Sequence, residues 1–403
     1  MFYLIITIVL GINLAWYLIS DYWLRHDLKN YPIARKYTRI ALVLWMLIIF
    51  IPIISATLGL GNPLESGPWL WTSALYLWIG AILLWMLGMG IVAITIWGFK
   101  YYNKYFNNKE QQNEENLNNH LSRRQFVKLG LVATPPLIVS GASVATFFDK
   151  KNLNVRIIDL PVVNLPPDLE GYTITHLSDT HVGILTGRER IENIVQTANQ
   201  LKSNITVITG DILDNNFDYM PDLIDFIGEL KAEQGVYLCI GNHDKIYDAN
   251  KWVNTVRNAG FNLLLDESTI IDTGSTPIKL LGIDFSYSEL QDLKNIRRAV
   301  EYTNTPGNSL KLLLTHHPHA FDAAVQANIP VTLAGHTHGG QLALRMGEDY
   351  ELFNAGNYLF RYVGGIYKKE GNSLFVHRGS GDWFPLRAGV PTEVVQLRLV
   401  AQS

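Results

Sequence analysis

Long apolar stretches dominate the first hundred residues of this chain, and only short ones follow. Three of the long stretches, residues 2–20, 40–60 and 69–98, reach the roughly 20 residues that a helix needs to span a bilayer. None carries a charged residue in its central portion, which argues against a transport path through them. The pattern predicts three membrane-spanning helices within residues 1–100 that act as an anchor.

Basic residues flank these stretches unequally. The loop after the first stretch contains five Lys or Arg residues, the loop between the second and third contains none, and several follow the third. Because basic loops stay in the cytoplasm, the N-terminus is predicted to lie outside.

Two further segments separate the apolar part from the remainder. Residues 101–121 are rich in Asn, Gln, Glu and Lys, which predicts a polar linker. Residues 122–148 begin with Ser-Arg-Arg-Gln-Phe-Val-Lys and continue as an apolar run. This segment resembles a twin-arginine export signal, with Val127 in place of the usual Leu; the alternative is a fourth membrane helix. Both alternatives place everything after residue 148 outside the cytoplasm.

From residue 154 onward, short β-branched apolar runs alternate with helical segments, which predicts a layered, largely parallel α/β sheet. Five of these runs end in polar residues that can bind metal ions. Because ligands gather beyond the carboxyl ends of parallel strands, we expect the five ends to converge. The polar residues that follow the runs are Asp179, His181, Asp211, Asp214, Asn242, His243, Asp244, His316, His317, His336 and His338.

Composition narrows the chemistry. The formal net charge of −3, without a basic stripe, gives no indication of nucleic-acid binding. The single cysteine, Cys239, excludes an internal disulfide and a cysteine-based zinc site. Burying several carboxylates and imidazoles together is costly unless a cation compensates them, so a metal centre is expected.

The order of the five motifs, D-x-H, G-D-x-x-D, G-N-H-D, H and G-H-x-H, resembles the calcineurin-like metallophosphoesterase superfamily over residues 154–403. The resemblance implies a layered α/β/β/α sandwich. Two further features, Gly339-Gly340-Gln341 and Arg378-Gly379-Ser380-Gly381, are similar to a bacterial branch of membrane-anchored or twin-arginine-exported phosphodiesterases.

The resemblance also implies two divalent ions, which could be Mn, Fe or Zn, and a metal-activated hydroxide as the nucleophile. Asp211 would be shared by both ions. The implied ligands are Asp179, His181, Asp211 and His338 for the first ion, and Asp211, Asn242, His316 and His336 for the second.

His243 and Asp214 are the predicted catalytic residues. His243 follows a ligand and is expected to stabilise the transition state or protonate the leaving oxygen, and Asp214 is expected to orient its imidazole. For Asp244 a helix cap and a functional part remain open. Arg361 and Arg387 could bind phosphate or a lipid headgroup, or could be solvated surface residues.

The sequence therefore predicts a metal-dependent phosphoester hydrolase in the cytoplasmic membrane, with its catalytic domain on the outer side. Phosphodiester, phosphomonoester or pyrophosphate bonds of an envelope or lipid-linked substrate are the expected targets, and the twin-arginine machinery is an expected partner. One alternative is a metal-binding sensor or scaffold with reduced turnover. A second makes the membrane half the working part, as a channel or transporter.

Overall fold

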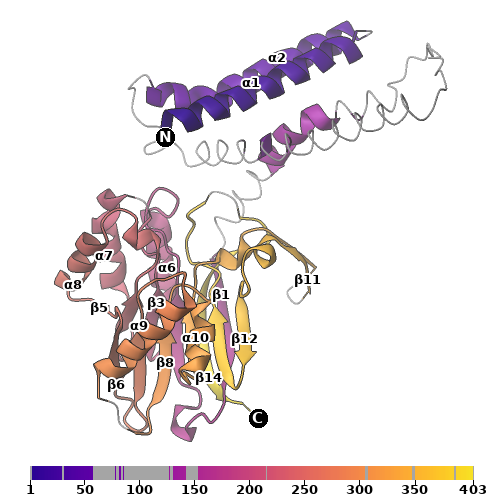
Figure 1. Ribbon diagram of the computed structural model, residues 1–403. Coiled ribbons are helices and arrows are strands. Elements are labelled where there is room, and N and C mark those ends of the chain that lie inside the picture. Colours follow the sequence, from indigo (N-terminus) through magenta and orange to yellow (C-terminus); the bar gives the residue numbers. More distant parts are fainter. Residues whose placement is uncertain are drawn as a thin grey trace. The chain divides into compact units, whose positions relative to one another are not determined.

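The computed structural model in Figure 1 divides the chain into two compact units, Met1–Ala145 and Thr146–Ser403. Each unit is considered by itself. The residues that the structure describes are 2–29, 31–57, 78, 81–82, 85, 127, 130–141, 153–214, 216–304, 307–346, 350–384 and 387–402.

The N-terminal unit contains two long helices, α1 (Phe2–Asp27) and α2 (Pro32–Thr57). Their connection is held by charge, because the buried carboxylate of Asp21 pairs with Arg25 in the same helix and with Arg39 in α2. All three residues lie outside the predicted membrane spans.

The predicted membrane region is described only in part. α1 and α2 coincide with the predicted spans 2–20 and 40–60 as far as residue 57. The span 69–98, the linker 101–121 and the segment 122–148 lie largely outside the described residues, apart from a helix at 130–141. Within the described ranges, no helix combines the length and the apolar character needed to cross a membrane. The membrane-spanning region stays a prediction.

The C-terminal unit is built on two six-stranded sheets and a separate two-stranded hairpin. The first sheet has the strand order β1-β14-β2-β3-β4-β5. Its strands are β1 (Leu153–Val162), β14 (Thr392–Ala401), β2 (Thr173–Leu177), β3 (Ile205–Thr209), β4 (Val236–Cys239) and β5 (Asn262–Leu263). The second sheet has the strand order β12-β13-β9-β8-β7-β6. Its strands are β12 (Gly365–Lys369), β13 (Asn372–Val376), β9 (Val331–Ala334), β8 (Leu310–Leu314), β7 (Ile278–Gly282) and β6 (Glu267–Ile271). The hairpin pairs β10 (Ala343–Met346) with β11 (Tyr350–Asn354).

The strands that carry the motifs run parallel within each sheet, as predicted. β2, β3 and β4 are parallel neighbours in the first sheet, and β8 and β9 in the second. The two sheets agree with the layered α/β/β/α sandwich that the resemblance implied, and the chain crosses from the first sheet to the second between β5 and β6. The site is consequently assembled from two sheets whose strand ends meet, rather than along one sheet edge.

Side-chain packing defines four layers (Figure 1). One apolar cluster lies between the two sheets and includes Ile174 and Val207 of the first and Leu312 and Leu333 of the second. Helices cover the outer faces, α6 (Arg188–Gln200), α7 (Met220–Glu229) and α8 (Ala249–Asn258) on the first sheet, and α9 (Glu289–Tyr302) and α10 (Ala320–Gln326) on the second. Short 3-10 turns complete the unit: η1 (Pro167–Leu169), η2 (Phe217–Tyr219), η3 (His243–Lys245), η4 (His338–Gly340) and η5 (Ala355–Tyr358).

The outer helical layer on the first sheet allows a test of the packing. Trp252 of α8 is fully buried in the cluster that joins the helices to this sheet. Trp252→Ala should lower the free energy of unfolding by about 3–5 kcal/mol, because the cavity it leaves cannot fully collapse. Tyr302→Ala, at a side chain 61% exposed, should change it by about 0.5 kcal/mol or less. Pulse proteolysis of the full chain in urea measures both, and equal shifts would contradict this packing.

Candidate active site

The predicted ligands all lie just beyond strand ends, and the fold brings them together. Asp179 and His181 follow β2, Asp211 follows β3 and Asn242 follows β4 in the first sheet. His316 follows β8 in the second sheet, and His336 and His338 follow β9. A hydrogen bond crosses between the sheets here, since the Nδ1 atom of His316 lies 2.7 Å from the carbonyl oxygen of Thr209.

Backbone conformation at these residues is unusual. Asp179, His181, Asp211, His336 and His338 all have positive φ angles, between 45° and 73°. Such values are disfavoured for residues with a Cβ and persist only where the surrounding structure enforces them. Their concentration on five predicted ligands indicates that the turns hold these side chains at a set position.

The first group consists of Asp179, His181 and His338. The Nε2 atoms of the two histidines are 3.1 Å apart, and that of His338 lies 3.3 Å from Oδ1 of Asp179. Burial lowers the pKa of His181 to about 3 and raises that of Asp179 to about 6. Uncharged imidazole is the form that binds a metal ion.

The second group consists of Asp211, His316 and His336. The Nε2 atom of His316 lies 3.1 Å from Oδ2 of Asp211 and 3.1 Å from Nδ1 of His336. Burial alone would lower the pKa of His316, but the charge of Asp211 outweighs it and raises that pKa to about 9. Asp211 therefore favours a positive charge at this point.

Asp211 connects the two groups. Its Oδ2 atom also lies 3.7 Å from Nε2 of His181, and its Oδ1 atom accepts a hydrogen bond of 2.8 Å from the backbone N–H of His243. Ligand atoms of His181, Asp211 and His243 form a further group within 4.8 Å of one another. A carboxylate at this position can be shared by two cations.

These residues fit a pair of divalent ions. Among the described residues, the three groups that could hold a metal ion all fall here. The Oδ1 atom of Asn242 is buried without a hydrogen-bond partner, which would be costly unless a cation binds it. Oxygen and imidazole donors without thiolate suit Mn, Fe or Zn.

His243 and Asp214 lie beside the two groups. The Nδ1 atom of His243 is 3.4 Å from Oδ1 of Asp214, and the same oxygen is 3.8 Å from Nδ1 of His181. Burial lowers the pKa of His243, but the neighbouring carboxylates of Asp214, Asp211 and Asp244 raise it overall. The His243 side chain is 14% exposed, whereas those of His181 and His316 are fully buried.

Asp244 does not cap the following helix, which was one of the two expectations for it. Its carboxylate accepts hydrogen bonds from the backbone N–H groups of Ile212, Leu213 and Gly241, at 2.9–3.0 Å. It thereby ties the turn after β3 to the turn after β4, and the cap of the following helix α8 is Asp248 instead.

Arg387 is a structural residue, which the sequence did not predict. Its guanidinium is buried, pairs with Asp382 at 2.7 Å and lies 3.0 Å from Nδ1 of His338. It therefore fixes the ring of a predicted ligand. Arg361 pairs with Asp322 at 2.6 Å at the start of α10.

Aromatic side chains lie around the predicted ligands. Phe285 and Phe360 have ring centroids 5.8 Å and 5.7 Å from that of His336. The ring centroid of Trp383 lies 5.8 Å from that of His243. All three belong to loops outside the five ligand motifs.

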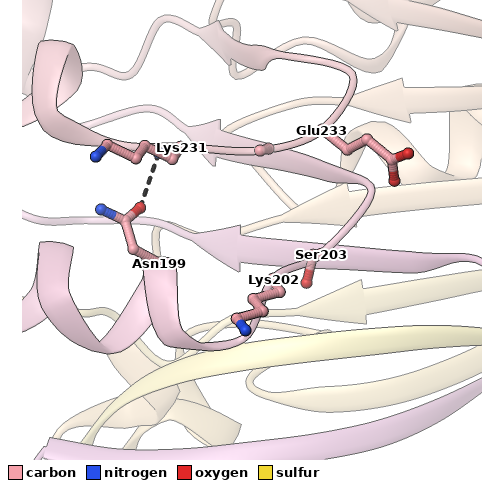
Figure 2. A pocket seen from close by; sticks show the side chains of 6 residues that line it. Asn199, Lys202, Ser203, Lys231 and Glu233 are labelled. Carbon is pink, nitrogen blue, oxygen red and sulfur yellow. Dashed lines mark hydrogen bonds between the residues drawn. The ribbon is translucent and has the colours of Figure 1, made fainter.

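A cavity of about 330 Å³ lies away from these residues (Figure 2). Asn199, Lys202, Ser203, Lys231 and Glu233 line it, and the Asn199 side chain accepts a hydrogen bond from the backbone N–H of Lys231. These residues precede β3 and β4, whereas the predicted ligands follow them. It shares no residue with the candidate metal groups.

Comparison with known proteins agrees with this geometry. Residues 172–340 match the family model described as calcineurin-like phosphoesterase. A Danio rerio protein described as a transmembrane protein with metallophosphoesterase domain is 29% identical over 69% of this chain and 63% of its own length. A Bos taurus protein of the same description is 29% identical over 61% of this chain and 57% of its own length. The chain thus spans less than two thirds of these two relatives.

A third relative is covered almost completely. The Bacillus subtilis protein described as uncharacterized metallophosphoesterase YkuE is 26% identical over 69% of this chain and 98% of its own length. The resemblance to the superfamily is confirmed, while the membrane-anchored, twin-arginine-exported branch stays a prediction.

A substitution at Gly241 tests the placement of Asp211. A Cβ atom on Gly241 would collide with the Asp211 carboxylate and backbone nitrogen. Gly241→Ala should therefore displace the Asp211 carboxylate and reduce the metal bound per chain. Gly187→Ala is the matched control, because a Cβ there meets open space. Elemental analysis after loading with Mn or Zn measures both, and an unchanged metal content in Gly241→Ala would refute this assignment of Asp211.

Proposed function

We propose that the chain is a metal-dependent phosphoester hydrolase that acts with two divalent ions on phosphodiester, phosphomonoester or pyrophosphate bonds. The match of residues 172–340 to the calcineurin-like phosphoesterase family model supports this. A further supporting observation is the position of Asp211 between the two candidate groups, because its carboxylate lies 3.1 Å from His316 of the second group and 3.7 Å from His181 of the first.

The proposed ligands keep the two sets given by the motif order. Asp179, His181, Asp211 and His338 would hold one ion, and Asp211, Asn242, His316 and His336 the other. When bound, such a pair neutralises charge on the phosphoryl oxygens and makes water acidic enough to supply the nucleophile near neutral pH. The protein supplies the fixed positions of these donors through the turns at the five strand ends.

His243 is the proposed proton donor and transition-state contact. Its partial exposure leaves it accessible to substrate, unlike the fully buried His181 and His316. Asp214, 3.4 Å from Nδ1, would hold the ring so that its other nitrogen is available to the leaving oxygen. A sensor or scaffold would not need this pair, and so the reading as an enzyme is favoured.

The proposed location is the outer face of the cytoplasmic membrane, with the chain anchored by its apolar N-terminal stretches. The absence of Lys and Arg between the second and third stretches, and the twin-arginine-like segment, support this orientation. Two of the relatives are also described as transmembrane proteins with a metallophosphoesterase domain. A tethered site raises the effective concentration of an envelope or lipid-linked phosphoester, which is the proposed substrate class.

Removing the proposed proton donor tests the chemistry. His243→Ala should lower kcat toward bis(p-nitrophenyl) phosphate by about 100- to 10,000-fold, since general acid catalysis by a positioned side chain contributes that much. Metal content should stay unchanged, because His243 is not a proposed ligand.

Tyr302→Ala, far from the motifs in the sequence, is the control and should match the wild type. Equal rates for His243→Ala and the wild type would contradict the role of His243. A metal-loaded wild type that hydrolyses no phosphodiester or phosphomonoester would favour the sensor or scaffold.

The route across the membrane is tested by replacing Arg123 and Arg124 with lysine. Twin-arginine export requires the guanidinium pair, so the double variant should leave the C-terminal unit protected from external protease in bacterial spheroplasts. A fourth membrane helix inserted by another route would keep its positive charges, and the unit would remain cleavable. Wild-type cells are the control, in which the unit should be cleaved.

A further inference from the structure

Large apolar side chains stand exposed on several loops of the catalytic unit. Tyr247, Tyr287, Tyr358, Leu359 and Trp383 are between 42% and 80% exposed. Single exposed apolar residues need no explanation, but a group of them marks an interaction surface. We refer to these five residues as the apolar rim.

The apolar rim adjoins the candidate metal groups. Trp383 has its ring centroid 5.8 Å from His243 and 6.3 Å from His338, and Tyr287 lies 6.3 Å from His336. Leu359 directly precedes Phe360, which contacts the ring of His336 at 5.7 Å. The rim therefore comes from separate loops next to the ligands.

Tyr247 joins the rim through the turn that carries His243. The backbone N–H of Ile246, its neighbour, donates to the carbonyl oxygen of His243, so η3 places Tyr247 close to the proposed proton donor.

The hairpin of β10 and β11 adds to this surface. It forms a two-stranded sheet of its own and extends away from the two large sheets (Figure 1). Leu344, Leu352 and Phe353 are each about half exposed, and Leu352 and Phe353 are consecutive, so apolar side chains occupy both faces. An isolated two-stranded hairpin is at best marginally stable in water, and an apolar surrounding would stabilise this one.

The base of the hairpin is fastened to the site. The side-chain amide of Asn354, at the end of β11, donates a 3.0 Å hydrogen bond to the carbonyl oxygen of Gly339, which follows His338. The hairpin is therefore held on the same side as the turn after β9.

We propose that the apolar rim and the β10–β11 hairpin enter the interfacial layer of a lipid bilayer, so that the active site opens toward the membrane surface. This inference rests on the proposed function, because it assigns the face by which the anchored enzyme meets its substrate. A bilayer at the rim would present a phosphoester headgroup beside His243 without removing the lipid from the membrane.

Two observations favour lipid over another occupant. Tyr and Trp combine an apolar ring with a polar group, the composition preferred at membrane–water interfaces, and three tyrosines and a tryptophan form most of the rim. The second observation is the short length of chain between the predicted apolar run and the catalytic unit. In the anchored protein only residues 149–152 separate the predicted apolar run from Leu153, a reach of at most about 18 Å. The catalytic unit would therefore stay close to lipid.

Site-specific labelling of the full chain tests this surface. The native Cys239 is fully buried, so a maleimide dye should react selectively at an introduced cysteine. Leu359→Cys carries the dye in the rim. Tyr302→Cys, at the far end of α9 from Tyr287, is the matched exposed control.

Both labelled proteins are reconstituted into phosphatidylethanolamine–phosphatidylglycerol vesicles with and without spin-labelled lipid. Emission from the dye at position 359 should shift to the blue and be lost when spin-labelled lipid is present, whereas emission from position 302 should not change. Equal quenching at both positions, or none at 359, would overturn the proposal. With pyrene maleimide as the label at position 359, excimer emission without lipid quenching would assign the surface to a second copy of the chain. That result would also overturn the proposal.

Hydrolysis of bis(p-nitrophenyl) phosphate by the unlabelled wild type, under the same conditions, separates the two proposals. Activity without quenching at position 359 would reject the lipid-facing surface and leave the proposed function intact. Quenching without activity would reject the proposed function and keep the surface.

Discussion

The catalytic unit depends on holding several carboxylates and imidazoles together inside a folded protein, with Asp211 at their centre. Buried groups of this kind repel one another and lose hydration, so they are stable only with a compensating charge. Rigid turns hold these groups in place, and a bound cation would supply the compensating charge. Five predicted ligands have left-handed backbone, and Gly241 allows the backbone to approach the Asp211 carboxylate where a Cβ would collide. The glycine and the left-handed turn at Asp211 both fix the position of this carboxylate.

The pairing of two sheets explains how one carboxylate can serve two groups. β2 and β3 bring His181 and Asp211 from the first sheet, and β8 brings His316 from the second. The bond between His316 and the carbonyl oxygen of Thr209 fixes the ring so that its other nitrogen faces Asp211. Residues outside the motifs then hold this arrangement, with Asp244 joining two turns and Arg387 supporting His338.

The sequence predicted those parts of the site that depend on strand ends. A buried strand followed by ligands has a short, regular pattern, and parallel strands bring such ends together, so the convergence of Asp179, Asp211 and His316 followed from local sequence. The division into two sheets followed from the resemblance carried by the motifs and not from the strand pattern, because alternating strands and helices are compatible with one sheet or two. The position of Arg387 depends on a long-range contact with His338 and left no local pattern.

Which substrate the site acts on depends on the loops around it. The turn that carries Asn242 and His243 continues into Tyr247, whereas Tyr287 follows β7 and Leu359 follows η5, on separate loops that contact His336 through Tyr287 and Phe360. In the proposed function the strands and predicted ligands would supply the phosphoester chemistry, whereas the apolar side chains would set the environment in which the substrate is presented. Because these side chains make no contribution to the core, they can change without disturbing Asp211 and its partners. The proposed substrate choice and membrane contact would therefore be separable from the proposed catalysis.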